Sequence, residues 1–342
     1  MGNPYYYRNK LQYPVGIDKN GNPVMGVYAN RTHNIIPTND CLIQNKKNQE
    51  IANDVFKFLI SNGVLPYNEA NGKGVLRHII VRIGLHTDEV MLILVLNNSN
   101  IQKENEFIDF ITKKHPEIKT IVKNINNKNT NVILGNINET IYGEGNIFDI
   151  LGDFKFKISP MSFYQVNPVQ TEILYNTAIE YAKLNGNETV LDLYCGIGTI
   201  GIFASKYAEK VYGIEIIENA VKDAKENCLI NHVKNAEFYH GEVEEILPKI
   251  MDKEKLKPDV IFVDPPRKGC DKKTIETLLK LEPKKIIYIS CNPATLARDV
   301  ALLEEKYQLE KVQPVDMFPW TSHVECCTIM GRREDCESVD IT

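Results

Sequence analysis

Several features that would assign a protein to a special class are missing from this chain of 342 residues. No apolar run approaches the roughly 18 residues that a membrane-spanning helix needs. The first ten residues are polar and rich in tyrosine, unlike a secretory signal peptide. No two of the eight cysteines have the Cys-x-x-Cys spacing typical of zinc sites. We therefore expect a cytoplasmic protein with reduced thiols and neither a metal site nor a membrane anchor.

A strong excess of positive charge is also missing. The net charge is −5, which does not by itself predict binding to nucleic acid. The balance is uneven, because residues 1–150 carry 16 Lys+Arg against 14 Asp+Glu (+2), whereas residues 151–342 carry 24 against 31 (−7). The mild positive bias of the first half is compatible with a surface that faces phosphates, and equally with an ordinary solvated surface.

The second half alternates short apolar runs with longer helical patterns. The predicted strands are Thr189–Leu193, Lys210–Ile216, Ala236–His240, Pro258–Val263 and Lys284–Ile289. The predicted helices between them are Thr199–Ala208, Asn219–Asn231, Lys272–Leu281 and Ala294–Tyr307. This alternation is typical of a parallel, doubly wound α/β sheet. Leu309–Met317 and Glu325–Arg332 follow without a helix between them, so they predict an antiparallel edge.

The first half has a different pattern. Val75–Ile83 and Val90–Leu96 predict a β-hairpin. Helices are predicted at Ile51–Ile60 and Glu104–Lys114, and further strands at Ile118–Asn124 and Asn131–Leu134. We therefore expect two domains, a smaller α+β domain over residues 1–158 and an α/β domain over residues 159–342.

Two polar motifs come directly after predicted strands of the second half. Asp264-Pro265-Pro266-Arg267 follows one strand, and Ser290-Cys291-Asn292-Pro293 follows the next. In open α/β sheets the carboxyl ends of the strands line the ligand crevice. An acid and a cysteine should therefore meet at this crevice, where the cysteine is a candidate covalent nucleophile.

A glycine-rich turn follows the first strand of the second half. Gly196, Gly198 and Gly201 match the spacing GxGxxG, and Glu215 ends the next predicted strand, where it could bind a ribose. This pattern fits a dinucleotide or S-adenosylmethionine, and a plain turn without a ligand is a weaker alternative. Asp192 at the strand end and Tyr194 before the first glycine favour S-adenosylmethionine.

Taken together and in this order, the motifs resemble one family. The segments Asp192 to Gly198, Asp264 to Arg267, Ser290 to Pro293 and His323-Val324-Glu325 are similar to those of the RumA/TrmA-type RNA uracil-5-methyltransferases. Phe163-Tyr164-Gln165-Val166-Asn167 and Tyr7-Arg8-Asn9-Lys10 resemble further motifs of that family. The matches span nearly the whole chain, and their combination is far more specific than any one of them.

The resemblance implies a class I (Rossmann-like) S-adenosylmethionine methyltransferase domain that methylates C5 of a uracil in RNA. It assigns the cofactor contacts to Gln165, Tyr194, Gly196, Glu215 and Asp264, the nucleophile to Cys291 and the base to Glu325. Some family members have asparagine at the position of Thr199, so no cofactor contact is predicted there.

The two catalytic assignments agree with the chemistry that C5 methylation requires. Uracil C5 is a poor nucleophile until a thiolate adds to C6, and a base must later remove the C5 proton. We expect the helix that begins near Pro293 to favour the thiolate of Cys291 through its dipole. The neighbours of Glu325 are apolar or small, so burial should raise its pKa into the range useful for a base.

The substrate is less narrowly defined than the chemistry. The resemblance favours 23S ribosomal RNA over transfer RNA, and the candidate phosphate contacts in the first half are Arg8, Lys10, Arg31, Arg77 and Arg82. Alternatives are methylation of a cytosine or an amine in a nucleic acid, a NAD-dependent oxidoreductase, and an idle RNA-binding module. The oxidoreductase would leave Cys291 and Glu325 without roles.

The resemblance also raises the question of an iron–sulfur cluster, which many members of the family carry. Cys41 resembles the fourth cluster ligand, but no cysteine precedes it. A cluster needs several thiolates, so we expect none in this chain and expect the chain to be a fragment of a longer protein. The remaining cysteines are read as structural or incidental, and no obligate protein partner is implied.

Overall fold

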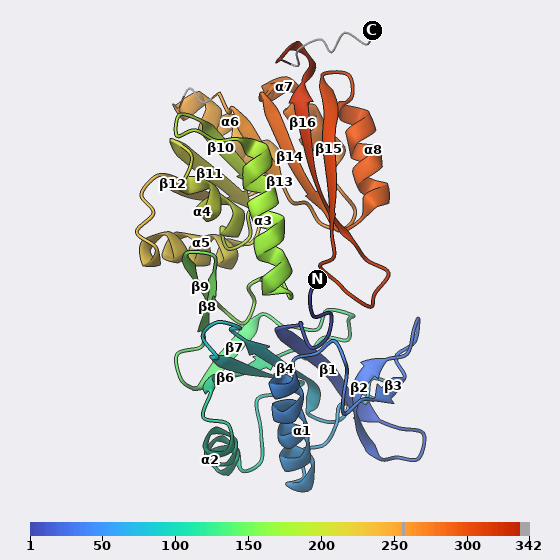
Figure 1. Ribbon diagram of the computed structural model, residues 1–342. Coiled ribbons are helices and arrows are strands. Elements are labelled where there is room, and N and C mark those ends of the chain that lie inside the picture. The colour runs from blue at the N-terminus through green and yellow to red at the C-terminus, as the bar shows by residue number, and fades with distance from the viewer. Residues whose placement is uncertain (255–256, 336–342) are drawn as a thin grey trace. The chain divides into compact units, whose positions relative to one another are not determined.

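The computed structural model describes residues 1–254 and 257–335; Cys336 lies outside this range. The chain divides into two compact units (Figure 1). The first contains Met1, Leu151–Phe156 and Ser162–Thr342, and the second contains Gly2–Ile150 and Lys157–Met161. The chain therefore passes between the units more than once near residues 150–162, and the predicted boundary at 158/159 falls inside this crossing segment.

The unit that contains most of the first half is built on one mixed sheet of order β3-β2-β1-β4-β5-β6-β7. Its strands are β1 (Lys10–Ile17), β2 (Pro23–Tyr28), β3 (Ile35–Pro37), β4 (Leu76–Ile83), β5 (Val90–Leu96), β6 (Ile118–Ile125) and β7 (Ile137–Tyr142). Its helices are α1 (Lys46–Ser61) and α2 (Glu104–Lys114). The helices pack apolar side chains such as Val55 and Phe107 into one core with Tyr13, Ile79 and Leu92 of the sheet.

Most predicted elements of this unit are present, and β4 pairs with β5 antiparallel as the hairpin pattern predicts. The prediction of a strand at Asn131–Leu134 is wrong, because the strand that pairs with β6 is β7. The Asn126 amide donates to the carbonyl oxygens of Val132 and Ile133 at 2.7 and 2.9 Å. A side chain therefore takes up carbonyl groups that a strand would use in its ladder.

The other unit contains a seven-stranded sheet of order β12-β11-β10-β13-β14-β16-β15. Its strands are β10 (Thr189–Leu193), β11 (Lys210–Glu215), β12 (Ala236–His240), β13 (Val260–Val263), β14 (Lys285–Ser290), β15 (Tyr307–Val315) and β16 (Glu325–Arg332). β10 to β14 are parallel to one another, while β16 pairs antiparallel with both β14 and β15. This is a class I methyltransferase fold with the predicted antiparallel edge.

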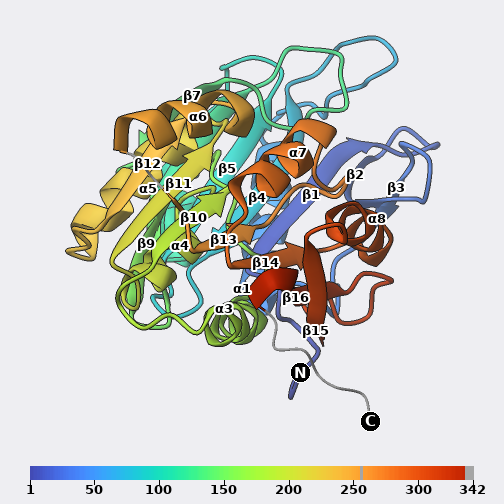
Figure 2. The ribbon, with the colours of Figure 1, turned by 90° about the horizontal axis from the view of Figure 1, so that it is seen from above.

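Helices cover both faces of this sheet (Figure 2). They are α3 (Pro168–Ala182), α4 (Thr199–Ser205), α5 (Glu218–Ile230), α6 (Val243–Glu254), α7 (Lys272–Leu281) and α8 (Pro293–Leu303). α3, α4 and α5 lie on one face, and α6, α7 and α8 on the other. A two-stranded sheet of β8 (Ile147–Leu151) and β9 (Phe154–Ile158) lies at the crossing between the units, and a short 3₁₀ turn, Arg333–Asp335, follows β16.

The strand order of this sheet locates its ligand crevice. From β10 the chain first proceeds outward to β11 and β12, and then returns to the other side of β10 to form β13. Open α/β sheets bind ligands at this reversal, outside the carboxyl ends of the strands. None of the helices in the described part of the chain is long and apolar enough to cross a membrane.

Candidate active site

The glycine-rich turn after β10 is held by two carboxylates. Asp192 is fully buried, and one of its oxygens accepts a hydrogen bond from the Gly201 amide at 2.8 Å. Its other oxygen, Oδ1, is buried without a hydrogen-bond partner. Burial raises the pKa of Asp192 to about 8. Glu215 accepts from the amides of Gly196, at 3.0 Å, and Ile217, at 2.9 Å, so its carboxylate is fixed beside the turn.

The backbone of the turn allows a ligand to approach closely. Gly196 has φ of 55°, in the left-handed region, and a Cβ at this position would meet no atom within 4 Å. The chemistry and the space therefore fit the adenosyl end of S-adenosylmethionine: backbone amides at a helix start, a carboxylate for ribose hydroxyls, and an open glycine face.

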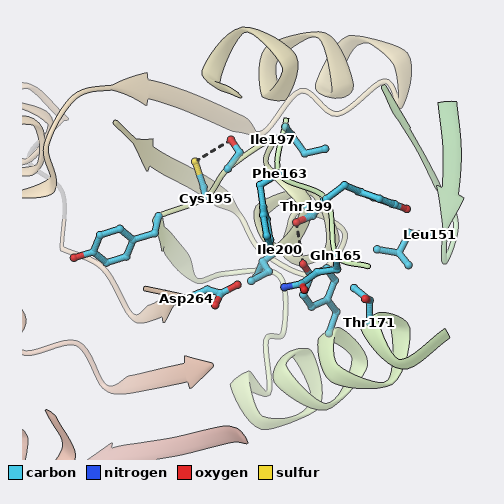
Figure 3. A pocket seen from close by; sticks show the side chains of 13 residues that line it. Leu151, Phe163, Gln165, Thr171, Cys195, Ile197, Thr199, Ile200 and Asp264 are labelled. Carbon is cyan, nitrogen blue, oxygen red and sulfur yellow. Dashed lines mark hydrogen bonds between the residues drawn. The ribbon is translucent and has the colours of Figure 1, made fainter. Parts of the chain in front are cut away.

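A small hollow lies at the switch point between β10 and β13 (Figure 3). Its lining includes two predicted cofactor residues at strand ends, Tyr194 and Asp264, together with Gln165 and Gly196. Glu215 does not line it. The hollow has a volume of about 30 Å³, which is room for roughly two water molecules. S-adenosylmethionine is much larger, so this hollow could enclose only part of it.

Phe163 is the most exposed aromatic side chain in the lining of the hollow. It is 67% exposed although it lines the hollow, and it lies beside Ile200 and Thr199 in Figure 3. It belongs to the segment between β9 and α3, which has no regular structure. Gln165, two residues further on, is buried and faces the same hollow.

Two aromatic side chains frame the hollow in different ways. Tyr194 has a left-handed φ of 64°, and its hydroxyl lies 3.0 Å from the Thr274 hydroxyl of α7. Tyr175 of α3 is buried, and its hydroxyl lies 3.1 Å from that of Thr199. The sequence analysis did not identify Tyr175, because it did not identify α3.

Cys291 and Glu325 are brought together by the antiparallel edge of the sheet. Ser290, the last residue of β14, lies opposite Cys326 of β16. Cys291 follows Ser290 directly and Glu325 is the first residue of β16. The two side chains are close enough for the charge of Glu325 to raise the pKa of Cys291. Cys291 is half-buried and Glu325 is buried, with its Oε2 atom lacking a hydrogen-bond partner.

The site raises the pKa values of its acidic groups. Burial, and secondarily the charge of Asp264, raises the pKa of Glu325 to about 8. Burial raises the pKa of Asp264 to about 7. The pKa of the Cys291 thiol is raised by burial and then by the carboxylate of Glu325, whereas the positive charge of Arg267 acts in the opposite direction.

The net shift of the Cys291 pKa is upward, because of burial and the neighbouring carboxylate. Cys291 precedes Asn292, the residue that caps α8 with its own side chain by accepting from the Ala294 amide at 3.1 Å. A lowering contribution from the α8 dipole stays a prediction. Arg267 is the nearby cation, since it lowers the pKa of both Cys291 and Glu325.

Two of the five predicted phosphate contacts are wrong. Arg77 and Arg82 are each 6% exposed, and both donate to backbone carbonyls, Arg77 to Asn126 at 2.7 Å and Arg82 to Ser159 at 3.2 Å. Lys10 is half-buried beside Arg82, and burial followed by the charges of Arg82 and Arg8 lowers its pKa to about 7. Arg31 is exposed and Arg8 is half-buried.

Within residues 1–254 and 257–335, no three His, Cys, Asp or Glu side chains are grouped to hold a metal ion.

Comparison with known proteins gives consistent matches over this architecture. Residues 151–333 match the family described as tRNA (Uracil-5-)-methyltransferase. A Bacillus cereus protein named an uncharacterized RNA methyltransferase is 48% identical over 335 residues, which are 98% of this chain and 72% of that protein. A Staphylococcus aureus protein with the same description is 50% identical over 331 residues, covering 97% of this chain and 73% of that protein.

A solved structure is also similar over most of the chain. It is the Pyrococcus abyssi tRNA (uracil-54, C5)-methyltransferase in complex with S-adenosyl-L-homocysteine, which is 29% identical with a TM-score of 0.78. The similarity covers 96% of this chain and 76% of that one.

Proposed function

Because the chain belongs to the family of RNA uracil-5-methyltransferases, we propose that it methylates C5 of a uracil in RNA through a covalent adduct with Cys291. The observation that supports this proposal is the closeness of Cys291, which directly follows β14, to Glu325, the first residue of the neighbouring strand β16. A nucleophile and a base on adjacent strands can reach the two neighbouring carbons, C6 and C5, of one pyrimidine ring.

The adduct is formed and resolved by these two residues. The thiolate of Cys291 forms a bond to C6, and the electron pair of the C5–C6 double bond moves toward C5 and the C4 carbonyl. C5 then accepts the methyl group. Glu325, as the carboxylate, removes the proton from C5; the pair returns to the C5–C6 bond and the bond to sulfur breaks. Its unpartnered Oε2 is the atom available for this proton.

The cofactor in this proposal is S-adenosylmethionine, which supplies an electrophilic methyl group when bound. Gln165, Tyr194, Gly196, Glu215 and Asp264 are proposed to hold it at the switch point of the sheet. The structure of the Pyrococcus abyssi relative contains the demethylated cofactor, which supports this choice. Asp264 can pair with a cationic group of the cofactor once it is ionised, and such pairing would lower its raised pKa.

The RNA is proposed to be ribosomal, with transfer RNA as the alternative. In either case the target base must leave its stack to reach a thiol that lies beside a buried carboxylate. The unit formed by residues 2–150 and 157–161 is proposed to contact the flanking RNA, and the methyltransferase unit to hold the target base. The expected absence of an iron–sulfur cluster stays a prediction.

The adduct itself provides the test. The protein is incubated with S-adenosylmethionine and in vitro transcribed 23S ribosomal RNA or transfer RNA in which 5-fluorouridine replaces uridine. Fluorine cannot leave as a proton, so a methylated protein–RNA complex should accumulate on a denaturing gel. Cys291→Ala should abolish this complex, whereas Cys41→Ala, a matched change at another half-buried thiol, should leave it unchanged.

A second variant tests the base separately. Glu325→Gln should accumulate the methylated adduct with ordinary RNA, because the C5 proton is no longer removed, and turnover should fall by roughly 10²–10⁴. Glu310→Gln, on the neighbouring strand β15, is the control. An adduct that survives in Cys291→Ala, or the absence of an adduct from both RNAs, would overturn the proposed mechanism.

A further inference from the structure

A second hollow lies far from the cofactor turn in sequence, within the unit that contains β1 to β7. It has a volume of about 700 Å³ and is formed by the end of β1, the β2–β3 connection and the segment before β4. This volume is in the range of ligand-binding pockets. The mechanism proposed above uses none of its residues.

Aromatic rings gather in this hollow. Tyr28 lies 5.4 Å from His33 and 6.4 Å from His78, measured between ring centroids, and meets His78 edge-on at 77°. Tyr67 lines the same hollow and is stacked by the Arg77 guanidinium, which lies 4.3 Å from its ring centroid. Tyr28 is 38% exposed and the His33 side chain is 59% exposed, so both offer surface on which a flat ligand can stack.

His78 supplies an unsatisfied polar group at the bottom of the hollow. It is 6% exposed, and neither ring nitrogen has a hydrogen-bond partner. The residue opposite it on β1 is Pro14, which has no amide hydrogen to offer. Burial, followed by the charge of Arg77, lowers the pKa of His78 to about 4, so the ring is neutral and presents one donor and one acceptor. Leaving both unpaired is unfavourable, because each buried group has lost its hydrogen bonds to water without gaining another partner.

The charges at the hollow are balanced. Glu69 pairs with His33 at 2.6 Å, and Arg77 is engaged by the carbonyl oxygens of Asn126 and Lys128. Asp18 and Lys19, of opposite charge, also line the hollow. A site with stacking rings, one neutral donor–acceptor group and charges of both signs suits a nucleobase better than a phosphate or a metal ion. Arg31, exposed two residues before His33, can meet the adjoining phosphate.

We propose that this hollow binds one unpaired nucleobase of the RNA, away from the methylated uracil, by stacking on Tyr28 and His33 and by hydrogen bonds to His78. Both nitrogens of His78 are shielded in the present conformation, so Tyr28 rotates as the base enters. The choice of RNA as the ligand rests on the proposed function. The stacking and hydrogen-bonding groups are observed in the structure independently of it. The site makes binding depend on a single-stranded nucleotide outside the target.

The test uses RNA that cannot be methylated. A fluorescent single-stranded decamer of alternating adenosine and cytidine contains no uracil, so its binding to the whole protein, measured by fluorescence anisotropy, is independent of methyl transfer. Tyr28→Leu should weaken binding about fivefold or more, the loss expected for one base stacked on an aromatic ring. His78→Leu should weaken it as well.

The matched control is Tyr142→Leu, because Tyr142 is a strand tyrosine of the same unit with almost the same exposure, 39%. Binding that is equally strong in Tyr28→Leu and Tyr142→Leu, or no measurable binding by the unchanged protein, would overturn the proposal. Methyl transfer to uridine-containing RNA is assayed in parallel. If Tyr28→Leu weakens decamer binding but no uracil is methylated, the base site stands and the proposed function fails. If uracil is methylated but Tyr28→Leu leaves decamer binding unchanged, the proposed function stands and the base site fails.

Discussion

At the scale of single residues, the proposed nucleophile Cys291 and the proposed base Glu325 both have raised pKa values, which favour their protonated forms. Burial raises the pKa of Glu325 to about 8 and also raises that of Cys291, and each group must lose a proton before it can act. Arg267 lowers both pKa values, although no predicted role was given to it beyond its place in a motif. A single guanidinium thus adjusts the two groups together.

The pH dependence of methyl transfer should report this arrangement. Because the active forms are the thiolate and the carboxylate and both pKa values are raised, the single-turnover rate should increase with pH through about pH 8, where Glu325 ionises, and should still increase above it as Cys291 ionises. Arg267→Gln removes the positive charge and should move the rise to higher pH, whereas Arg267→Lys should leave it near its original position. A profile that is flat, or that has the same midpoint in all three proteins, would contradict the role given to Arg267.

At the scale of secondary structure, local pattern predicted the strands of the methyltransferase sheet well and some other elements poorly. α3 was overlooked, although Asn167 caps it, Pro168 is its first residue and its buried positions recur every three to four residues. That signal was present in the sequence. The failure at Asn131–Leu134 is different, because the Asn126 side chain decides it from outside the segment.

Close packing between β11 and β12 lies next to the glycine-rich turn after β10. Gly213 of β11 lies against Phe238 of β12, and a Cβ at Gly213 would come within 2.3 Å of the Phe238 ring and 3.0 Å of the Cys195 sulfur. Gly213→Ala should therefore destabilise the protein by about 1–3 kcal/mol, as overpacking does, and should weaken S-adenosylmethionine binding. Urea denaturation and calorimetric titration measure the two effects.

A compensating variant distinguishes crowding from other causes. In Gly213→Ala combined with Phe238→Leu, the smaller side chain should make room for the added methyl group. The double variant should then lose less stability than the sum of the two single changes. If the losses of stability of the two single variants simply add in the double variant, contact with Phe238 is not the reason that Gly213→Ala destabilises the protein.

At the scale of the whole molecule, the two units contain different kinds of site. The methyltransferase unit buries acidic groups around its proposed cofactor and base sites, while the other unit carries the aromatic hollow. Burial raises the pKa of Asp192 to about 8, of Glu325 to about 8 and of Asp264 to about 7. These pKa values are far above those near 4 that carboxyl groups have in an unfolded chain. The folded protein therefore binds more protons at neutral pH than the unfolded chain does.

The stability of the methyltransferase unit should consequently fall as pH rises. A carboxyl group with a raised folded pKa has no cost below about pH 4, where both states are protonated, and its full cost above about pH 8, where both are ionised. Asp192→Asn keeps an acceptor for Gly201 and removes the titration, so it should reduce the fall by about 2 kcal/mol or more. Trp320, the single tryptophan, provides the fluorescence signal for urea denaturation.

The control for this prediction is Asp252→Asn, a change at an exposed aspartate in α6 of the same unit. It should leave the pH dependence as it is in the unchanged protein. If the free energy of unfolding depends on pH equally in all three proteins, ionisation of Asp192 does not destabilise the folded chain.

The sequence alone determined the alternating strands and helices, the glycine turn and the order of the motifs, because each depends on residues close together in the chain. Those motifs were also enough to indicate the family. The tertiary structure decided what depends on distant neighbours: the pairing of β14 with β16 that brings Cys291 near Glu325, the burial that raises their pKa values, and the carbonyl groups that engage Arg77 and Arg82. Charge, pairing and exposure are properties of a side chain's surroundings, and those surroundings are assembled only when the chain folds.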